Sequence, residues 1–124
     1  MPEPAHLAIP ILHVTDLNAA IAFYTGVLGF EEDFRYEDLY GGLRTGNVHL
    51  HLRQGEGPFS RPVGGANVYF YLASPADIDA YHAAIVANGA RVDHEPQDWP
   101  YGMRDFATFD PDGNVLAFGA ETGA

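Results

Sequence analysis

The sequence contains no cysteine and no lysine, and both absences exclude particular kinds of chemistry. Without cysteine the chain has no disulfide, no thiolate metal ligand and no thiol nucleophile. Without lysine it forms no Schiff base and has no P-loop. No apolar run approaches the roughly 20 residues that span a bilayer. The first residues show neither the basic nor the apolar segment of a secretory signal, so we expect a cytoplasmic protein.

Positive charge is scarce as well. The 17 Asp and Glu residues face only six arginines, which gives a formal net charge of −11. Because nucleic acids and anionic membranes are bound by clustered Arg and Lys, we expect neither as a partner. A negative field of this size attracts cationic small molecules. The same acidity can also serve only to keep a protein soluble, and the charge alone does not decide between these two interpretations.

The first half of the chain predicts one strand, one helix and three further strands. Thr15 or Asp16 is expected to cap the helix, and Gly29 to stop it. The predicted strands lie at residues 7–13, 30–36, 39–45 and 48–53. Residues 55–66 are rich in Gly and Pro and are interpreted as a linker.

The second half repeats this order. Ser74 and Pro75 predict a helix start, and Asn88-Gly89 its end. The predicted strands lie at residues 67–73, 90–95, 104–109 and 114–119. We therefore expect an α+β fold in one domain, 1–124, made of tandem βαβββ modules, with module one up to about residue 54 and module two from about residue 67. The strands would form a curved mixed sheet with a concave cleft, and the helices would cover its outer face.

A tight turn at Asp110-Pro-Asp-Gly113 separates the last two predicted strands. Upstream of it, Trp99 and Tyr101 are expected in a loop, since prolines flank Trp99 on both sides at positions 96 and 100. Aromatic faces stack on planar heterocycles and on cations, so these two side chains are candidates for ligand contact.

Several segments together resemble the vicinal oxygen chelate superfamily, which groups glyoxalase I, fosfomycin-modifying transferases, extradiol dioxygenases and bleomycin resistance proteins. They are Pro-Ile-Leu-His-Val-Thr-Asp-Leu from residue 10, Val-Leu-Gly-Phe from residue 27, and Asp-Pro-Asp-Gly-Asn from residue 110. The segments at 30–34, 43–52 and 101–106 are most similar to bleomycin resistance proteins. The resemblance implies a homodimer with an exchanged N-terminal strand containing Pro10, and ligand clefts at the dimer interface.

The resemblance also places the metal-ligand positions of the superfamily at Ile9, Ala117, about Leu50 and near Asn67. Ile and Ala cannot donate to a cation, so we expect no metal and no other cofactor. A slip of one residue at Leu50 would bring in His49 or His51, which share one strand face. The alternative function is therefore a metal-dependent lyase, dioxygenase or glutathione/thiol transferase with a displaced ligand set of His49, His51 and a carboxylate such as Glu121.

The favoured function is non-catalytic: sequestration of a bleomycin-type cationic glycopeptide. Another antibiotic or a metabolite is also possible as the ligand. The two serines, Ser60 in the linker and Ser74 at a helix cap, suggest no nucleophile, and no catalytic residue is predicted. The predicted ligand-binding residues are Phe34, Tyr36, Asp38, Tyr40, His49, His51, Trp99, Tyr101 and Arg104.

Overall fold

The computed structural model describes residues 2–57 and 60–123, which form two helices and eight strands. Module one contains β1 (Ile11–Val14), α1 (Leu17–Gly26), β2 (Glu31–Tyr36), β3 (Tyr40–Thr45) and β4 (Val48–Gln54). Module two contains β5 (Asn67–Tyr71), α2 (Pro75–Ala87), β6 (Arg91–Trp99), β7 (Met103–Phe109) and β8 (Val115–Glu121). The predicted α+β class and the repeated βαβββ order are confirmed.

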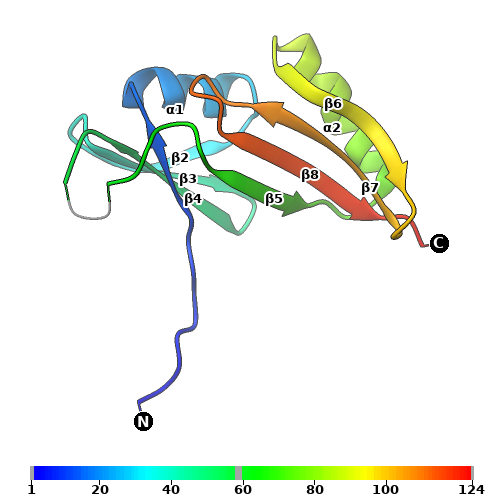
Figure 1. The fold of residues 1–124 in the computed structure, drawn as a ribbon, viewed down its shortest axis with the longest axis horizontal. Coiled ribbons are helices and arrows are strands. Elements are labelled where there is room, and N and C mark those ends of the chain that lie inside the picture. The colour runs from blue at the N-terminus through cyan, green and yellow to red at the C-terminus, as the bar shows by residue number, and fades with distance from the viewer. Residues whose placement is uncertain (1, 58–59, 124) are drawn as a thin grey trace.

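The strands form two four-stranded mixed sheets, not one continuous sheet. The order is β1-β4-β3-β2 in module one and β5-β8-β7-β6 in module two, so the second sheet repeats the first. In each sheet the pair formed by the module's first and last strands is parallel and the others are antiparallel. The two sheets lie side by side, and each carries its own helix (Figure 1). The other face of each sheet carries no helix, and we call it the open face.

Local capping interactions stabilise the start of both helices. The Asp16 carboxylate accepts a hydrogen bond from the Ala19 amide at the start of α1, and the Ser74 hydroxyl accepts one from the Asp77 amide at the start of α2. The buried side of α1 contains Leu17, Ala20, Ile21 and Tyr24. That of α2 is narrower and contains Ile78 and Ile85. These side chains pack on alternate strand residues such as Leu43 and Phe106 to form one hydrophobic core.

The turn at Asp110 joins the two modules. One oxygen of its buried carboxylate accepts from the amides of Asp112 and Asn114, both at 2.9 Å. The other accepts from the Tyr24 hydroxyl of α1 at 2.9 Å and from the Asn114 side chain at 2.8 Å. Asp112 in turn accepts from the Thr15 amide. The motif that pointed to the superfamily therefore links module two to the helix of module one.

Two predicted boundaries are wrong. The first strand begins at Ile11, and residues 2–10 leave the body of the molecule as an extended arm (Figure 1). The sixth strand runs to Trp99 instead of ending at residue 95. Trp99 is thus the last residue of β6 and not part of a loop, whereas Tyr101 lies in the turn that follows.

Neither helix in the described part of the chain has the length and apolar character needed to cross a bilayer.

Candidate functional site

The open face of module two is hollowed into a groove of about 380 Å³. On β7, Asp105 and Ala107 face this groove, while Phe106 between them packs in the core beneath α2. The other strands contribute the remaining walls. The groove is lined by side chains that include those of Tyr69, His94, Trp99, Tyr101, Asp105 and Ala117.

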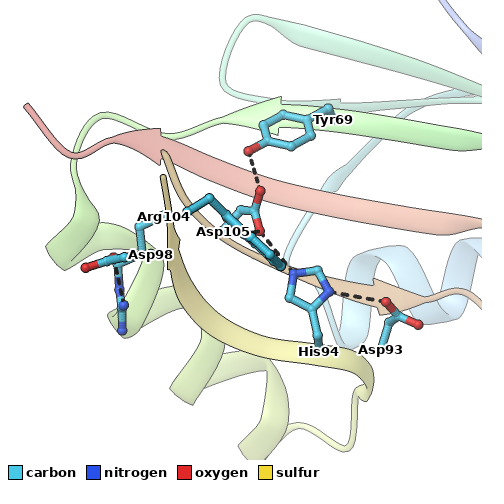
Figure 2. A network of polar contacts seen from close by, with 7 residues as sticks. Tyr69, Asp93, His94, Asp98, Arg104 and Asp105 are labelled. Carbon is cyan, nitrogen blue, oxygen red and sulfur yellow. Dashed lines mark hydrogen bonds and ion pairs between the residues drawn. The ribbon is translucent and has the colours of Figure 1, made fainter. Parts of the chain in front are cut away.

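Asp105 is the centre of a hydrogen-bond network in the groove, and its side chain is almost fully buried (Figure 2). Its Oδ1 accepts from the indole Nε1 of Trp99 at 2.7 Å and lies 3.0 Å from Nε2 of His94. Its Oδ2 accepts from the Tyr69 hydroxyl at 2.8 Å. The second ring nitrogen of His94 lies 3.2 Å from Asp93. Residues of β5, β6 and β7 are thereby connected through one carboxylate.

A glycine makes this connection possible. Tyr69 lies on β5 and Asp105 on β7, and β8 runs between them, with Gly119 paired to Asp105. A Cβ atom at position 119 would lie 2.1 Å from the Tyr69 hydroxyl oxygen. The missing side chain therefore lets the phenol cross β8 to reach the carboxylate.

The protonation states follow from these contacts. Burial raises the pKa of Asp105, but hydrogen bonds from His94, Tyr69 and Trp99 lower it more, so the net pKa lies below its ordinary value. Partial burial lowers the pKa of His94, but its bonds to Asp105 and Asp93 raise it more, so the net pKa lies above its ordinary value. Burial and then the bond to Asp105 raise the pKa of Tyr69. These contacts thus favour the ionised form of Asp105 and shift His94 toward its protonated form.

Two predicted aromatic residues, Trp99 and Tyr101, line the groove together. Their rings are stacked with centroids 6.2 Å apart and planes 14° from parallel. Trp99 is half-buried and hydrogen-bonded, whereas Tyr101 is 69% exposed.

A second aromatic cluster lies on the open face of module one. Phe34 and Tyr40 are stacked at 6.1 Å, and both contact the ring of His51 edge-on at 5.2 Å. The Tyr40 hydroxyl is 2.8 Å from Nδ1 of His51. Burial, and then the neighbouring His49, lower the pKa of His51. The structure thus brings together three of the predicted ligand-binding residues, on a different sheet from Trp99 and Tyr101.

The other predicted residues are more scattered. Tyr36 is exposed at the end of β2, and Asp38 is exposed in the turn that follows. His49 lies near Asp33 at 3.6 Å. Arg104 lies on the helix side of the second sheet, where its guanidinium bonds Asp79 of α2 and Asp98 of β6. Figure 2 shows Arg104 and Asp98 pointing away from the groove network.

The sequence-based prediction missed four residues of the network: Tyr69, Asp93, His94 and Asp105. In the sequence His94 looked isolated, because its partner Asp105 lies on another strand. Its other partner, Asp93, is the preceding residue of the same strand. The available signal was Asp105 itself, an acidic residue at an alternating position in the predicted strand 104–109. A carboxylate at such a position requires partners, because burying an unpaired charge is costly.

The comparisons with known proteins agree with this architecture. The family model of the Glyoxalase/Bleomycin resistance protein/Dioxygenase superfamily matches residues 4–118. The chain belongs to this superfamily. The resemblance drawn from the sequence motifs is thereby confirmed. No curated protein matches the chain.

Solved structures of this superfamily include both binding proteins and enzymes. The bleomycin-binding protein from bleomycin-producing Streptomyces verticillus, complexed with copper(II)-bleomycin, is 28% identical with a TM-score of 0.75, over 95% of this chain and 98% of that one. A lactoylglutathione lyase from Agrobacterium tumefaciens is 26% identical with a TM-score of 0.78, over 95% of each chain. The fosfomycin resistance protein FosX from Listeria monocytogenes, complexed with Mn(II) and sulfate, is 20% identical with a TM-score of 0.72, over 97% of this chain and 93% of that one, and shows the shared fold alone.

The residues at the superfamily's metal-ligand positions do not fit a divalent cation. Ile9 lies in the arm, and Ala117 lines the groove with no donor atom. Leu50 is 1% exposed and packs in the core, which leaves Asn67, at the edge of the groove, as the one polar side chain of the four. Hydrocarbon side chains provide no ligand atoms for a metal.

Within one chain the displaced ligand set of His49, His51 and Glu121 is not assembled either. Glu121 lies at the end of β8, on the other sheet from the two histidines of β4. Across residues 2–57 and 60–123, no three His, Asp or Glu side chains converge so as to hold a metal ion.

A second cavity, of about 670 Å³, lies beside the N-terminal arm of this superfamily member. It is lined by Leu7 and Ile9 of the arm, Val48 of β4, and Tyr69 and Tyr71 of β5. Leu7, Val48 and Tyr71 are exposed. The arm therefore carries an apolar surface that this chain leaves uncovered.

Proposed function

We propose that this protein is a non-catalytic binding protein that sequesters a bleomycin-type cationic glycopeptide antibiotic. The observation that carries the proposal is the groove of module two, where the aromatic faces of Trp99 and Tyr101 lie beside the carboxylates of Asp93 and Asp105. Aromatic faces bind planar rings and cations, and the net charge of −11 favours a cationic ligand. The bleomycin-binding protein of Streptomyces verticillus, at 28% identity, supports the same ligand class.

The proposal includes a homodimer. The groove is a shallow concavity of one chain, and the aromatic cluster of Phe34, Tyr40 and His51 lies on a separate sheet. A second copy that receives the exposed arm, residues 2–10, would cover Leu7 and Ile9 and bring module one of one chain opposite module two of the other. Each cleft would then have two aromatic walls. Binding would confer resistance by mass action, with no bond of the drug changed.

A titration of the purified protein with metal-free bleomycin tests the ligand. Trp99 is the single tryptophan of the chain, so its fluorescence reports on the groove alone. We expect saturable binding at micromolar drug or below, together with a change in Trp99 emission. Calorimetry on the same samples would give the number of drug molecules per chain. Absence of binding at micromolar bleomycin would overturn the proposed ligand.

The alternative is a metal-dependent reaction, which the 26% identity to a lactoylglutathione lyase favours. The hydrocarbon side chains of Ile9 and Ala117 argue against it. Elemental analysis of protein purified without chelator separates the two functions. A divalent metal present in a stoichiometric amount would contradict our proposal, whereas metal-free protein that binds bleomycin would support it.

A further inference from the structure

We propose that Asp105 is a positioning residue, which holds Trp99 and Tyr69 as fixed walls of the groove so that it accepts a planar ring. This inference rests on the proposed function, because it explains how the groove recognises its ligand. It concerns a residue that need not touch the ligand itself. Asp105 acts through the side chains that it orients.

Each oxygen of Asp105 is directed at a different wall: Oδ1 at the indole of Trp99 and Oδ2 at the phenol of Tyr69, at 2.7 and 2.8 Å. Both distances lie within the ordinary range for hydrogen bonds of their kind. An indole has one N–H donor, and a single bond from it restrains the rotation of the whole ring. The carboxylate therefore sets the planes of two aromatic rings at once.

The charge of Asp105 supports the same role. Asp105 is only 5% exposed, and an ionised carboxylate buried to this extent is costly unless it is paired and hydrogen-bonded. His94 is the paired group. Its two ring nitrogens lie 3.0 Å from Asp105 and 3.2 Å from Asp93, and only an imidazolium donates at both nitrogens. Trp99, which carries no charge, contacts the ring edge-on with the centroids 6.1 Å apart, and the Tyr69 phenol reaches the same carboxylate from β5. The imidazolium thus balances the charge of Asp105.

The two stacked rings differ in how firmly they are held. Trp99 is hydrogen-bonded to Asp105, while Tyr101 is largely exposed. Their centroids are 6.2 Å apart, whereas a ring inserted between them needs roughly 7 Å, twice the contact distance of two carbon atoms. A planar ligand therefore stacks between them only if one ring moves. Because Asp105 holds the indole, the ring that moves is Tyr101.

The experiment compares Asp105→Asn with Asp98→Asn. The control makes the same chemical change on β6, but Asp98 bonds Arg104 on the helix side of the sheet. The readouts are quenching of Trp99 emission by acrylamide, the pH dependence of that emission, and the affinity for bleomycin. The first two need no ligand. Circular dichroism confirms that each variant is folded.

For Asp105→Asn we expect a more accessible indole and a His94 titration midpoint shifted to lower pH, because one of the two carboxylate partners is lost. We expect bleomycin binding to be between about tenfold and a hundredfold weaker, because the amide keeps a single acceptor oxygen and no charge, so it cannot hold both Trp99 and Tyr69 as the carboxylate does. Asp98→Asn should match the wild type in all three. Wild-type quenching and an unshifted midpoint in Asp105→Asn would overturn the inference.

A second variant keeps the test decisive if Asp105→Asn does not fold. Tyr69→Phe removes only the hydroxyl, so it should weaken bleomycin binding severalfold while His94 still titrates in the wild-type range. Binding equal to the wild type would overturn the role of Tyr69 as a fixed wall. If the wild type binds no bleomycin, the proposed function fails, and the emission readouts still decide whether Asp105 orients Trp99.

Discussion

The bond between Tyr24 and Asp110 crosses the junction of the modules, and its removal should destabilise the whole domain. Tyr24→Phe deletes one hydroxyl, which donates to the buried Asp110 carboxylate at 2.9 Å. Asp110 keeps three other donors: the amides of Asp112 and Asn114, and the Asn114 side chain. The charge is therefore not orphaned, and the loss corresponds to one hydrogen bond to a charged group, about 2 kcal/mol.

This free energy corresponds to a measurable shift in melting temperature. The entropy of unfolding is about 2.1 cal/mol/K per residue, so for 124 residues it is roughly 0.26 kcal/mol/K. A loss of about 2 kcal/mol therefore lowers Tm by about 8 °C. Thermal and urea unfolding, followed by circular dichroism, measure both quantities. Because the bond links two modules that share one core, we expect one transition with an unchanged m-value.

Tyr81→Phe is the matched control. Its hydroxyl donates to the Leu28 carbonyl at 2.6 Å, a neutral acceptor, so its loss should cost only about 1 kcal/mol, or about 4 °C. Both variants remove a single phenolic oxygen next to the same core. If Tyr24→Phe is no more destabilising than Tyr81→Phe, the charged carboxylate is not what stabilises the junction.

Three further predictions concern the groove and the helices. Gly119→Ala should push Tyr69 away from Asp105 and lower the free energy of unfolding by about 1–2 kcal/mol, measured by urea unfolding. The control Gly26→Ala, whose added Cβ has nothing within 4 Å, should be neutral or stabilising. The pKa of His94 in the folded protein lies above 6.5. The stability advantage of the wild type over His94→Gln should therefore be complete just below pH 6.5 and decline as the pH rises through the folded pKa. A stability advantage that grows with pH would contradict this prediction. Ser74→Ala removes the cap of α2 and should lower Tm by about 4 °C, from a loss of about 1 kcal/mol.

The sequence predicted the helices more accurately than the strands, and the reason is physical. A helix start depends on local chemistry such as the Asp16 and Ser74 caps, which are visible in the sequence. A strand also needs a partner. Residues 7–10 have the apolar pattern of a strand, yet only the segment from Ile11 onward pairs in register with β4. The sixth strand continued past Pro96 because β6 is an edge strand, where proline is tolerated, and its pairing with β7 is irregular there.

The site was only partly predictable. Aromatic residues were sound candidates because their chemistry is visible in the sequence, and the structure brings Trp99 and Tyr101 together in one groove. The Asp105 network was not predictable, because it depends on the register of the four strands β5 to β8 and on the glycine that β8 places between Tyr69 and Asp105. Pairwise register is a tertiary property that a local pattern does not contain.

In both modules an aromatic side chain lies over a glycine of an inner strand, but the two resulting sites differ chemically. In module one the ring of Phe34 lies over Gly42, where a Cβ would be 2.1 Å away, and reaches His51 on the next strand. In module two Tyr69 lies over Gly119 and reaches Asp105. In both, a glycine on an inner strand lets an aromatic side chain cross it. The first site is aromatic, with a histidine whose pKa is lowered, and the second holds an ionised carboxylate paired with His94. Under the proposed dimer, every cleft would combine one site of each kind, so a ligand with both a planar ring and a cationic tail would match it better than either group alone.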